Sequence, residues 1–169
     1  MKLDLRFSSF LVLALGLNGC REGQNADHPS DHDSKSPGAG EHATAHVHVA
    51  PHGGTLVELG EHRFNLELVV EAKSGSLAAY VLDAHAENFL RVPLASFQIT
   101  LDLKGGTRPV LMSAVADSRT GETVGDTSRF EGKDEGMKDS AGFAGTVTEI
   151  EIGGSRFSGV KFRIPKDKL

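Results

Sequence analysis

The sequence predicts an all-β domain, an immunoglobulin-like antiparallel β-sandwich of about seven or eight strands, with a small β-barrel as the alternative. Short segments alternate apolar and polar residues with a period of two, pairs of turn-forming residues separate them, and no window has an apolar stripe of helical period. The alternation is clearest at 64–70, 97–103, 148–152 and 160–164. Less regular strands are expected at 55–59, 77–83, 110–115 and 127–131.

Turn-forming pairs fall between the expected strands: Gly60-Glu61, Ser74-Gly75, Gly105-Gly106 and Gly153-Gly154. The polar, Gly-rich stretch 117–146 is long for a compact domain, so we expect it to hold one edge strand and a mobile excursion around 133–140. On the last two strands, we expect Glu149 and Glu151 to face Lys161 and Arg163 as cross-strand ion pairs.

Length and charge exclude several classes of protein. The chain has 169 residues, with 18 Lys+Arg against 23 Asp+Glu, which suits one domain with appendages and argues against nucleic-acid binding. The single Cys excludes an internal disulfide framework and a cysteine-rich zinc module. The chain has no Gly-x-Ser-x-Gly elbow, His-Glu-x-x-His motif or phosphate-binding loop, so we do not expect an enzyme.

The N-terminus predicts export. Lys2 and Arg6 precede an apolar run, 7–17, which has the length of a signal-peptide core and is shorter than the roughly 20 residues of a membrane span. Residues 1–19 are therefore expected to be a signal peptide. The run ends in Leu17-Asn18-Gly19-Cys20, which resembles a bacterial lipobox. An ordinary secretory signal with a chance cysteine is the alternative.

The lipobox resemblance implies that Cys20 carries acyl chains such as palmitate, which anchor the protein in a membrane. Arg21 stands where an Asp would favour retention at the inner membrane, so the resemblance implies an outer-membrane anchor facing the periplasm. Residues 20–51 have no aromatic side chain and are rich in Gly, Ser, Asp and His, which predicts a disordered tether with a reach of about 30 Å. The β-sandwich domain is expected to occupy 52–169.

The densest group of potential metal ligands lies at the end of this tether. The proposed ligands are His42, His46, His48 and His52, with weaker candidates at His28, His32, His62 and His85. Neutral imidazole binds Zn(II), Cu(II) and Ni(II), and histidine-rich tracts are a metal-binding composition. His46 and His48 lie on the same side of an extended backbone, about 6.5 Å apart.

Other interpretations of these histidines stay open. The tether is alternatively a plain spacer, or a stalk that gains charge as the pH falls below about 6.5. His52, in Pro51-His52-Gly53-Gly54, is alternatively part of a turn that leads into the first strand. His62 and His85 join a ligand set only if their loops converge.

The run His52-Gly53-Gly54-Thr55-Leu56-Val57-Glu58-Leu59-Gly60, followed by Leu66-Glu67-Leu68-Val69 and Ala79-Tyr80-Val81-Leu82-Asp83, resembles a module of small uncharacterised bacterial periplasmic lipoproteins. It is also similar to periplasmic segments of heavy-metal efflux adaptor (membrane fusion) proteins. The resemblance covers about 51–103 and implies a β-sandwich in a metal-stress context, with His52 the residue carried over most directly. The chain lacks the long helical hairpin and lipoyl-type segments of an adaptor.

The sequence therefore predicts a lipid-anchored periplasmic protein that buffers or delivers divalent Zn, Cu or Ni near an envelope metal transport system. A metal efflux complex is the expected partner besides the membrane. The alternative is a non-enzymatic interaction or structural lipoprotein whose His-rich segment is only a spacer. The metal, the partner protein and the oligomeric state stay open.

Overall fold

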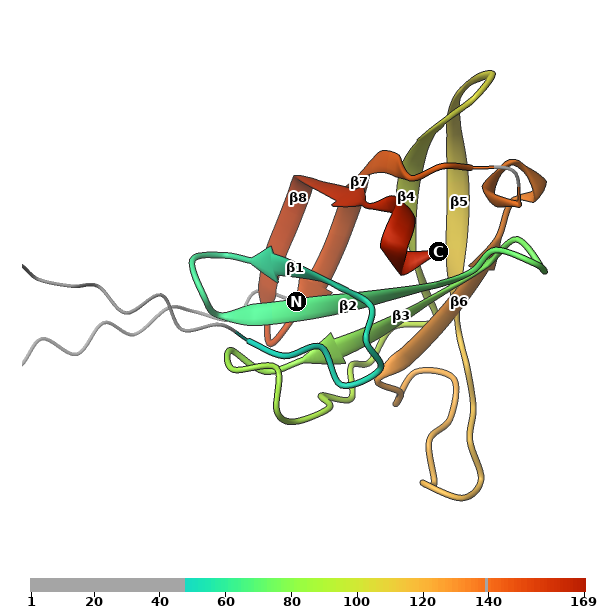
Figure 1. Ribbon diagram of the computed structural model, residues 1–169. Coiled ribbons are helices and arrows are strands. Elements are labelled where there is room, and N and C mark those ends of the chain that lie inside the picture. The colour runs from blue at the N-terminus through green and yellow to red at the C-terminus, as the bar shows by residue number, and fades with distance from the viewer. Residues whose placement is uncertain (1–47, 139) are drawn as a thin grey trace, which may run out of the picture. The chain divides into compact units, whose positions relative to one another are not determined.

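The computed structural model describes residues 48–138 and 140–169. The expected signal peptide 1–19, Cys20, His28, His32, His42 and His46 lie outside the described residues. Within those ranges the chain forms eight β-strands and two short 3₁₀ helices, and no α-helix (Figure 1). The strands are β1 (Thr55–Leu59), β2 (Phe64–Glu71), β3 (Ser76–Leu82), β4 (Ser96–Leu103), β5 (Gly106–Ala114), β6 (Arg129–Lys133), β7 (Phe143–Ile152) and β8 (Ser155–Ile164). The helices are η1 (Glu135–Met137) and η2 (Lys166–Lys168).

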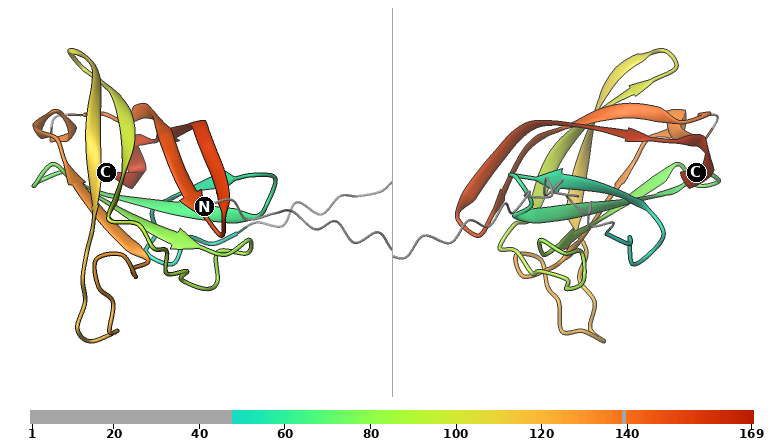
Figure 2. Two further views of the ribbon diagram at one scale, coloured as in Figure 1. Left: turned by 180° about the vertical axis from the view of Figure 1, so that it is seen from behind. Right: turned by 60° about the vertical axis from the view of Figure 1, so that its left-hand side comes forward.

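All eight strands belong to one antiparallel sheet in the order β1-β2-β3-β6-β5-β4-β7-β8. The sheet coils so that β1 to β3 cross β4, β5, β7 and β8 at a steep angle, and the edge strands β1 and β8 come close together (Figures 1 and 2). Side chains bridge the two edges, with the rings of Phe64 and Phe157 centred 5.9 Å apart and Arg63 donating to Ser155 Oγ at 2.9 Å. The predicted all-β antiparallel fold is confirmed, as a nearly closed sheet consistent with a sandwich or a small barrel.

Each predicted strand overlaps an observed one, although β5, β7 and β8 begin earlier than predicted. Residues Thr55–Leu59 form β1 with the predicted bounds, and all four predicted turn pairs connect strands. The inward-facing side chains form a single aliphatic core with a few Phe and Met. Its fully buried members include Leu59, Leu66, Leu77, Ile99, Leu101, Met112, Phe130 and Ile164. No helix among the described residues is long and apolar enough to cross a membrane.

Strand β2 departs from a simple two-faced strand. The alternation puts Asn65 and Glu67 on its polar face, but both are buried, with 4% and 0% exposed. Residues 52–54 and the segment after β3 fold over this face and bond to them: Gly54 donates to Glu67, and Asn65 donates to the carbonyl of Asp83. The covering segments are distant in sequence, which is why strand periodicity did not show the burial.

The β7–β8 hairpin bends near its middle. Thr148 and Glu149 are exposed in succession on β7, where the register against β4 shifts, and Gly159 on β8 has a φ of 67°. The predicted cross-strand ion pairs are wrong. Register sets Glu149 opposite Ser158 and Glu151 opposite Arg156, while Lys161 and Arg163 face small uncharged residues. Arg156 approaches Glu149 at 3.5 Å instead.

Two expectations for 117–146 need revision. Strand β6 lies between β3 and β5 inside the sheet, so the predicted edge strand is wrong. The segment expected as an excursion contains η1, whose Met137 is fully buried in the core. Asp134 caps this helix by accepting from Gly136 at 2.8 Å, and Arg108 donates to the same carboxylate at 3.0 Å.

Candidate functional site

Three histidines from three separate segments meet at one end of the sheet. His48 precedes β1, His62 lies in the β1–β2 turn, and His85 follows β3. The ring centroid of His48 is 6.5 Å from that of His62 and 5.8 Å from that of His85. We call His48, His62 and His85 the histidine cluster. The sequence predicts that His62 and His85 join a ligand set only if the loops that carry them converge. The two loops do converge, beside His48 near the end of the predicted tether.

Nδ1 is the ring nitrogen engaged in the two contacts that orient this cluster. His48 Nδ1 lies 3.1 Å from the carbonyl oxygen of His85, and His62 Nδ1 lies 3.2 Å from Glu58 Oε2. The backbone N–H of His62 also donates to Glu58 Oε1, at 2.7 Å. Metal-bound histidines commonly use their second nitrogen in this way, on a carboxylate or a backbone carbonyl. These contacts leave Nε2 of His48 and of His62 as the nitrogen that could bind a ligand.

The backbone beside His62 and His85 is held in an unfavourable conformation. Glu61 and His62 follow Gly60 with φ values of 50° and 63°, and Ala86, next to His85, has a φ of 59°. The left-handed region costs a residue with a Cβ about 1–2 kcal/mol relative to its preferred conformation, and glycine would avoid that cost. Strain of this kind concentrates at functional sites.

The two ring separations that involve His48 are close to those of metal-bound imidazoles. Three imidazoles bound tetrahedrally at 2.0–2.1 Å would have ring centroids about 5 Å apart. The separations of the His48 ring from those of His85 and His62, 5.8 and 6.5 Å, exceed that value by about 1 and 1.5 Å. Within 48–138 and 140–169, no group of three or more His, Cys, Asp or Glu side chains is placed so that it could hold a metal ion.

His52 has a different environment, set by a buried carboxylate. Glu67 is fully buried and accepts from the His52 backbone N–H at 2.7 Å and from Gly54 N–H at 2.9 Å, both on Oε1. Its Oε2 lies 2.8 Å from His52 Nδ1. The His52 ring stacks on Tyr80 with centroids 4.0 Å apart and planes 19° apart. The structure thus places the proposed ligands His48 and His52 with different partners.

Glycine at position 54 makes this arrangement possible. A Cβ there would lie 2.5 Å from the carbonyl oxygen of Leu68 and 2.9 Å from the Val69 side chain. Gly53 has a φ of 72°, and its carbonyl accepts from Lys168 Nζ at 2.8 Å. The turn Pro51-His52-Gly53-Gly54 therefore lies directly against β2, and this position places the ring of His52 beside Glu67 and Tyr80.

A pocket of about 360 Å³ opens beside His52. Its lining combines aromatic, basic, acidic and hydroxyl side chains: His52, Tyr80, Phe89, Arg91, Asp117, Arg119, Thr120, Glu122, Ser128 and Arg129. Sequence reasoning missed this site apart from His52. The one available signal was Tyr80, the single tyrosine of a chain without tryptophan.

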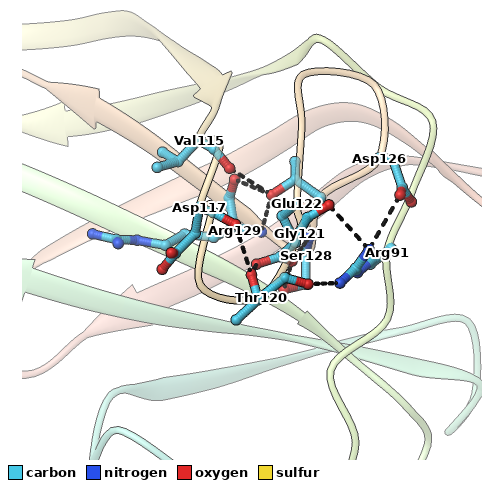
Figure 3. Close-up of polar contacts among 10 residues, drawn as sticks. Arg91, Val115, Asp117, Thr120, Gly121, Glu122, Asp126, Ser128 and Arg129 are labelled. Atoms are coloured by element: carbon cyan, nitrogen blue, oxygen red, sulfur yellow. Dashed lines mark hydrogen bonds and ion pairs between the residues drawn. The ribbon is translucent and has the colours of Figure 1, made fainter.

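The loop between β5 and β6 forms one wall of the pocket and is held by its own polar network (Figure 3). Asp117 accepts three bonds from Arg119, two of them from the side chain, and this pairing lowers the Asp117 pKa to about 2. Arg91 donates to the carbonyl of Thr120 and lies 3.3 Å from Asp126. These bonds fix the loop from both sides.

Glu122 is the central acceptor of this network. Its Oε1 accepts from the backbone and the hydroxyl of Ser128, at 2.8 and 2.6 Å, and its Oε2 accepts from Thr120 at 2.7 Å. Burial raises the pKa of Glu122, but these hydrogen bonds outweigh it, and the pKa is lowered. Both carboxylate oxygens of Glu122 thus accept hydrogen bonds within the protein.

The domain thus carries two distinct features, an exposed histidine cluster and a pocket walled by His52 and Tyr80. The first offers imidazole nitrogens to a cation. The second offers aromatic surface and guanidinium N–H groups. No protein-family model, no curated protein and no solved structure matches this chain.

Proposed function

We propose that this chain is a lipid-anchored periplasmic protein that binds a divalent transition metal, Zn, Cu or Ni, and buffers or delivers it beside an envelope metal transport system. The observation that carries the proposal is the convergence of His48, His62 and His85 from three segments, with ring centroids 5.8 and 6.5 Å apart. Histidines placed by chance on three loops would have no reason to meet.

The donor set favours borderline metals. The cluster supplies imidazole nitrogens, and Glu58 supplies a carboxylate at 3.2 Å from His62. Met112 and Met137, the two methionines within the described residues, are fully buried in the core. Nitrogen and oxygen donors without sulfur suit Zn(II), Cu(II) and Ni(II) better than Cu(I).

His42 and His46 complete the proposed site. Both lie outside the described residues, and His46 precedes His48 by two positions. A metal that already holds the three clustered imidazoles needs one more ligand for a tetrahedral shell. Either histidine would supply it, and binding would then also hold the end of the tether on the domain.

Calorimetric titration tests the proposal. Zn(II), Cu(II) and Ni(II) are titrated into the mature chain that carries Cys20→Ser, which removes the lipid attachment. We expect saturable binding of one ion, lost in His48→Ala/His62→Ala/His85→Ala. In His42→Ala/His46→Ala it should be weakened about tenfold, as expected when one ligand is removed. His28→Ala/His32→Ala is the matched control and should bind like the parent chain.

No saturable binding in the parent chain would sink the metal proposal. Equal binding in the triple variant and the parent chain would remove the histidine cluster from it. The anchor is tested separately in cells. Labelled palmitate should enter the wild-type protein and not the Cys20→Ser protein.

The second candidate is a non-enzymatic interaction lipoprotein. Leu111 on β5 is 61% exposed and lines a groove of about 540 Å³ with residues of β6, which favours this candidate. If no metal binds, cross-linking in envelope preparations, compared between wild type and Leu111→Ser, is the next measurement. A partner lost in Leu111→Ser would identify this groove as the interface.

A further inference from the structure

The pocket beside His52 has an aromatic wall that is open to solvent. His52 stacks on Tyr80, and the ring of Phe89 lies 6.0 Å from that of Tyr80 at 63° and 5.5 Å from that of His52. Phe89 is 46% exposed, although the domain buries most of its other large apolar side chains. A half-exposed aromatic ring in a concave, polar-rimmed surface is typical of a ligand site.

Each of the two acidic groups that line the pocket already accepts three hydrogen bonds within the protein. Asp117 accepts from Arg119 with both oxygens, at 2.9, 3.1 and 2.7 Å. Glu122 accepts from Ser128 and Thr120 with both of its oxygens. A cationic ligand would have to share these carboxylates with their present donors.

The guanidinium groups, in contrast, retain donors. An arginine has five N–H donors in a planar fork, and Arg119 spends its Nε and one terminal nitrogen on Asp117. Its side chain is 85% exposed at the rim of the pocket. Arg91 and Arg129 pair with Asp126 and Glu131, which lie outside the lining. The pocket therefore offers N–H donors next to aromatic surface.

We propose that this pocket binds a small aromatic carboxylate, with its ring against Phe89 and Tyr80 and its carboxylate on Arg119. The planar fork of arginine matches the two oxygens of a carboxylate, and the aromatic wall matches a single ring. A volume of about 360 Å³ is at the small end of ligand pockets, which suits a one-ring molecule. None of the cluster histidines lines the pocket, so this site is separate from the histidine cluster.

The composition of the chain provides a clean probe of this site. Tyr80 is the only tyrosine and there is no tryptophan, so intrinsic tyrosine fluorescence reports on the pocket wall alone. Phenylacetate is titrated into the mature Cys20→Ser chain in the presence of a chelator, with tyrosine fluorescence and ligand-observed NMR saturation transfer as readouts. Acetate, which has the charge without the ring, and benzyl alcohol, which has the ring without the charge, are titrated in parallel.

We expect saturable binding of phenylacetate at about millimolar concentration or tighter, and at least about tenfold weaker binding of acetate and of benzyl alcohol. Arg119→Lys keeps the charge without the planar fork, and Phe89→Ala removes the ring surface. Each should weaken phenylacetate binding about tenfold while circular dichroism shows an unchanged fold. Arg156→Ala, which removes an exposed arginine on β8 outside the pocket, should bind like the parent chain.

Equal affinity for phenylacetate and benzyl alcohol would overturn the carboxylate assignment. A loss in Arg156→Ala as large as that in Arg119→Lys would show that the losses are not specific to the pocket and would overturn the assignment to Arg119. If neither readout changes at phenylacetate concentrations well above millimolar, the pocket is not a site for this class of ligand. All three outcomes are measured with metal chelated, so they do not depend on the histidine cluster.

Discussion

His48 and His52 are four positions apart in the sequence, yet their side chains lie in very different environments. His52 is bound through its backbone and its ring to a fully buried carboxylate and is stacked on Tyr80. Among the described residues, His48 has a polar contact with the backbone of His85 and lies beside the rings of His62 and His85, which are both exposed. The contacts of His52 therefore tie it to the fold, whereas the ring of His48 is placed beside two other imidazoles.

Glu67→Ala should have the largest effect, because Glu67 holds the structural side of this comparison. Removing the carboxylate leaves the His52 and Gly54 N–H groups and the His52 ring without their acceptor. Together with the cavity, this should lower the free energy of unfolding by about 3–5 kcal/mol. Urea denaturation measures it.

Glu58→Ala is the matched control, since Glu58 holds His62 as Glu67 holds His52 but is 45% exposed. It should cost less than about 1 kcal/mol. Equal losses in the two variants would mean that burial does not separate the two histidine environments.

Gly54→Ala and Gly53→Ala separate close packing from backbone conformation in the same turn. A Cβ at 54 would meet the Leu68 carbonyl at 2.5 Å, while a Cβ at 53 would meet nothing within 4 Å but would sit at a φ of 72°. We expect Gly54→Ala to cost about 2–3 kcal/mol, and Gly53→Ala about 1 kcal/mol. The reverse order in thermal or urea unfolding would contradict the packing of this turn on β2.

His62→Gly tests whether His62 lowers the stability of the fold while contributing to metal affinity. Glycine relieves a φ of 63° at this position, so the variant should unfold at an equal or higher free energy, by up to about 1 kcal/mol. Metal affinity measured by calorimetry should fall about tenfold or more. A destabilised variant with unchanged metal affinity would assign His62 to the fold instead of the ligand set.

Local patterns predicted the elements of this fold well. The bounds of β1, the alternation of β2 and β4, and the glycine turns all follow from spacing over a few residues. Contacts between distant segments did not follow. The insertion of β6 between β3 and β5 and the register of β7 on β8 depend on pairing partners, which alternation does not specify.

The candidate site shows the same difference between what local patterns predict and what contacts between distant segments decide. His62 and His85 could be named as candidates from their residue type, but their meeting with His48 depends on three loops that only the folded sheet brings together. The alternation of β2 placed Glu67 on a solvent face because the covering turn at 52–54 is distant in sequence. Arg91 and Arg119 are ordinary charged residues in sequence, and only the ordered β5–β6 loop puts them around a pocket.

Asp117→Asn should give the smallest effect, because Asp117 has as many hydrogen bonds as Glu67 but lies beside an arginine that is 85% exposed. Its pKa of about 2 in the folded protein is below its ordinary value of 3.8, so the ionised form is the one that stabilises the fold. That contribution is complete above about pH 4 and is lost as the pH falls toward 2. The difference in unfolding free energy between wild type and Asp117→Asn should therefore be small at pH 7 and shrink between pH 4 and pH 2.

Arg119→Ala should remove most of this pH dependence, since Arg119 causes the lowered pKa. A difference that stays constant from pH 7 to pH 2 would mean that this pair does not hold the loop through charge.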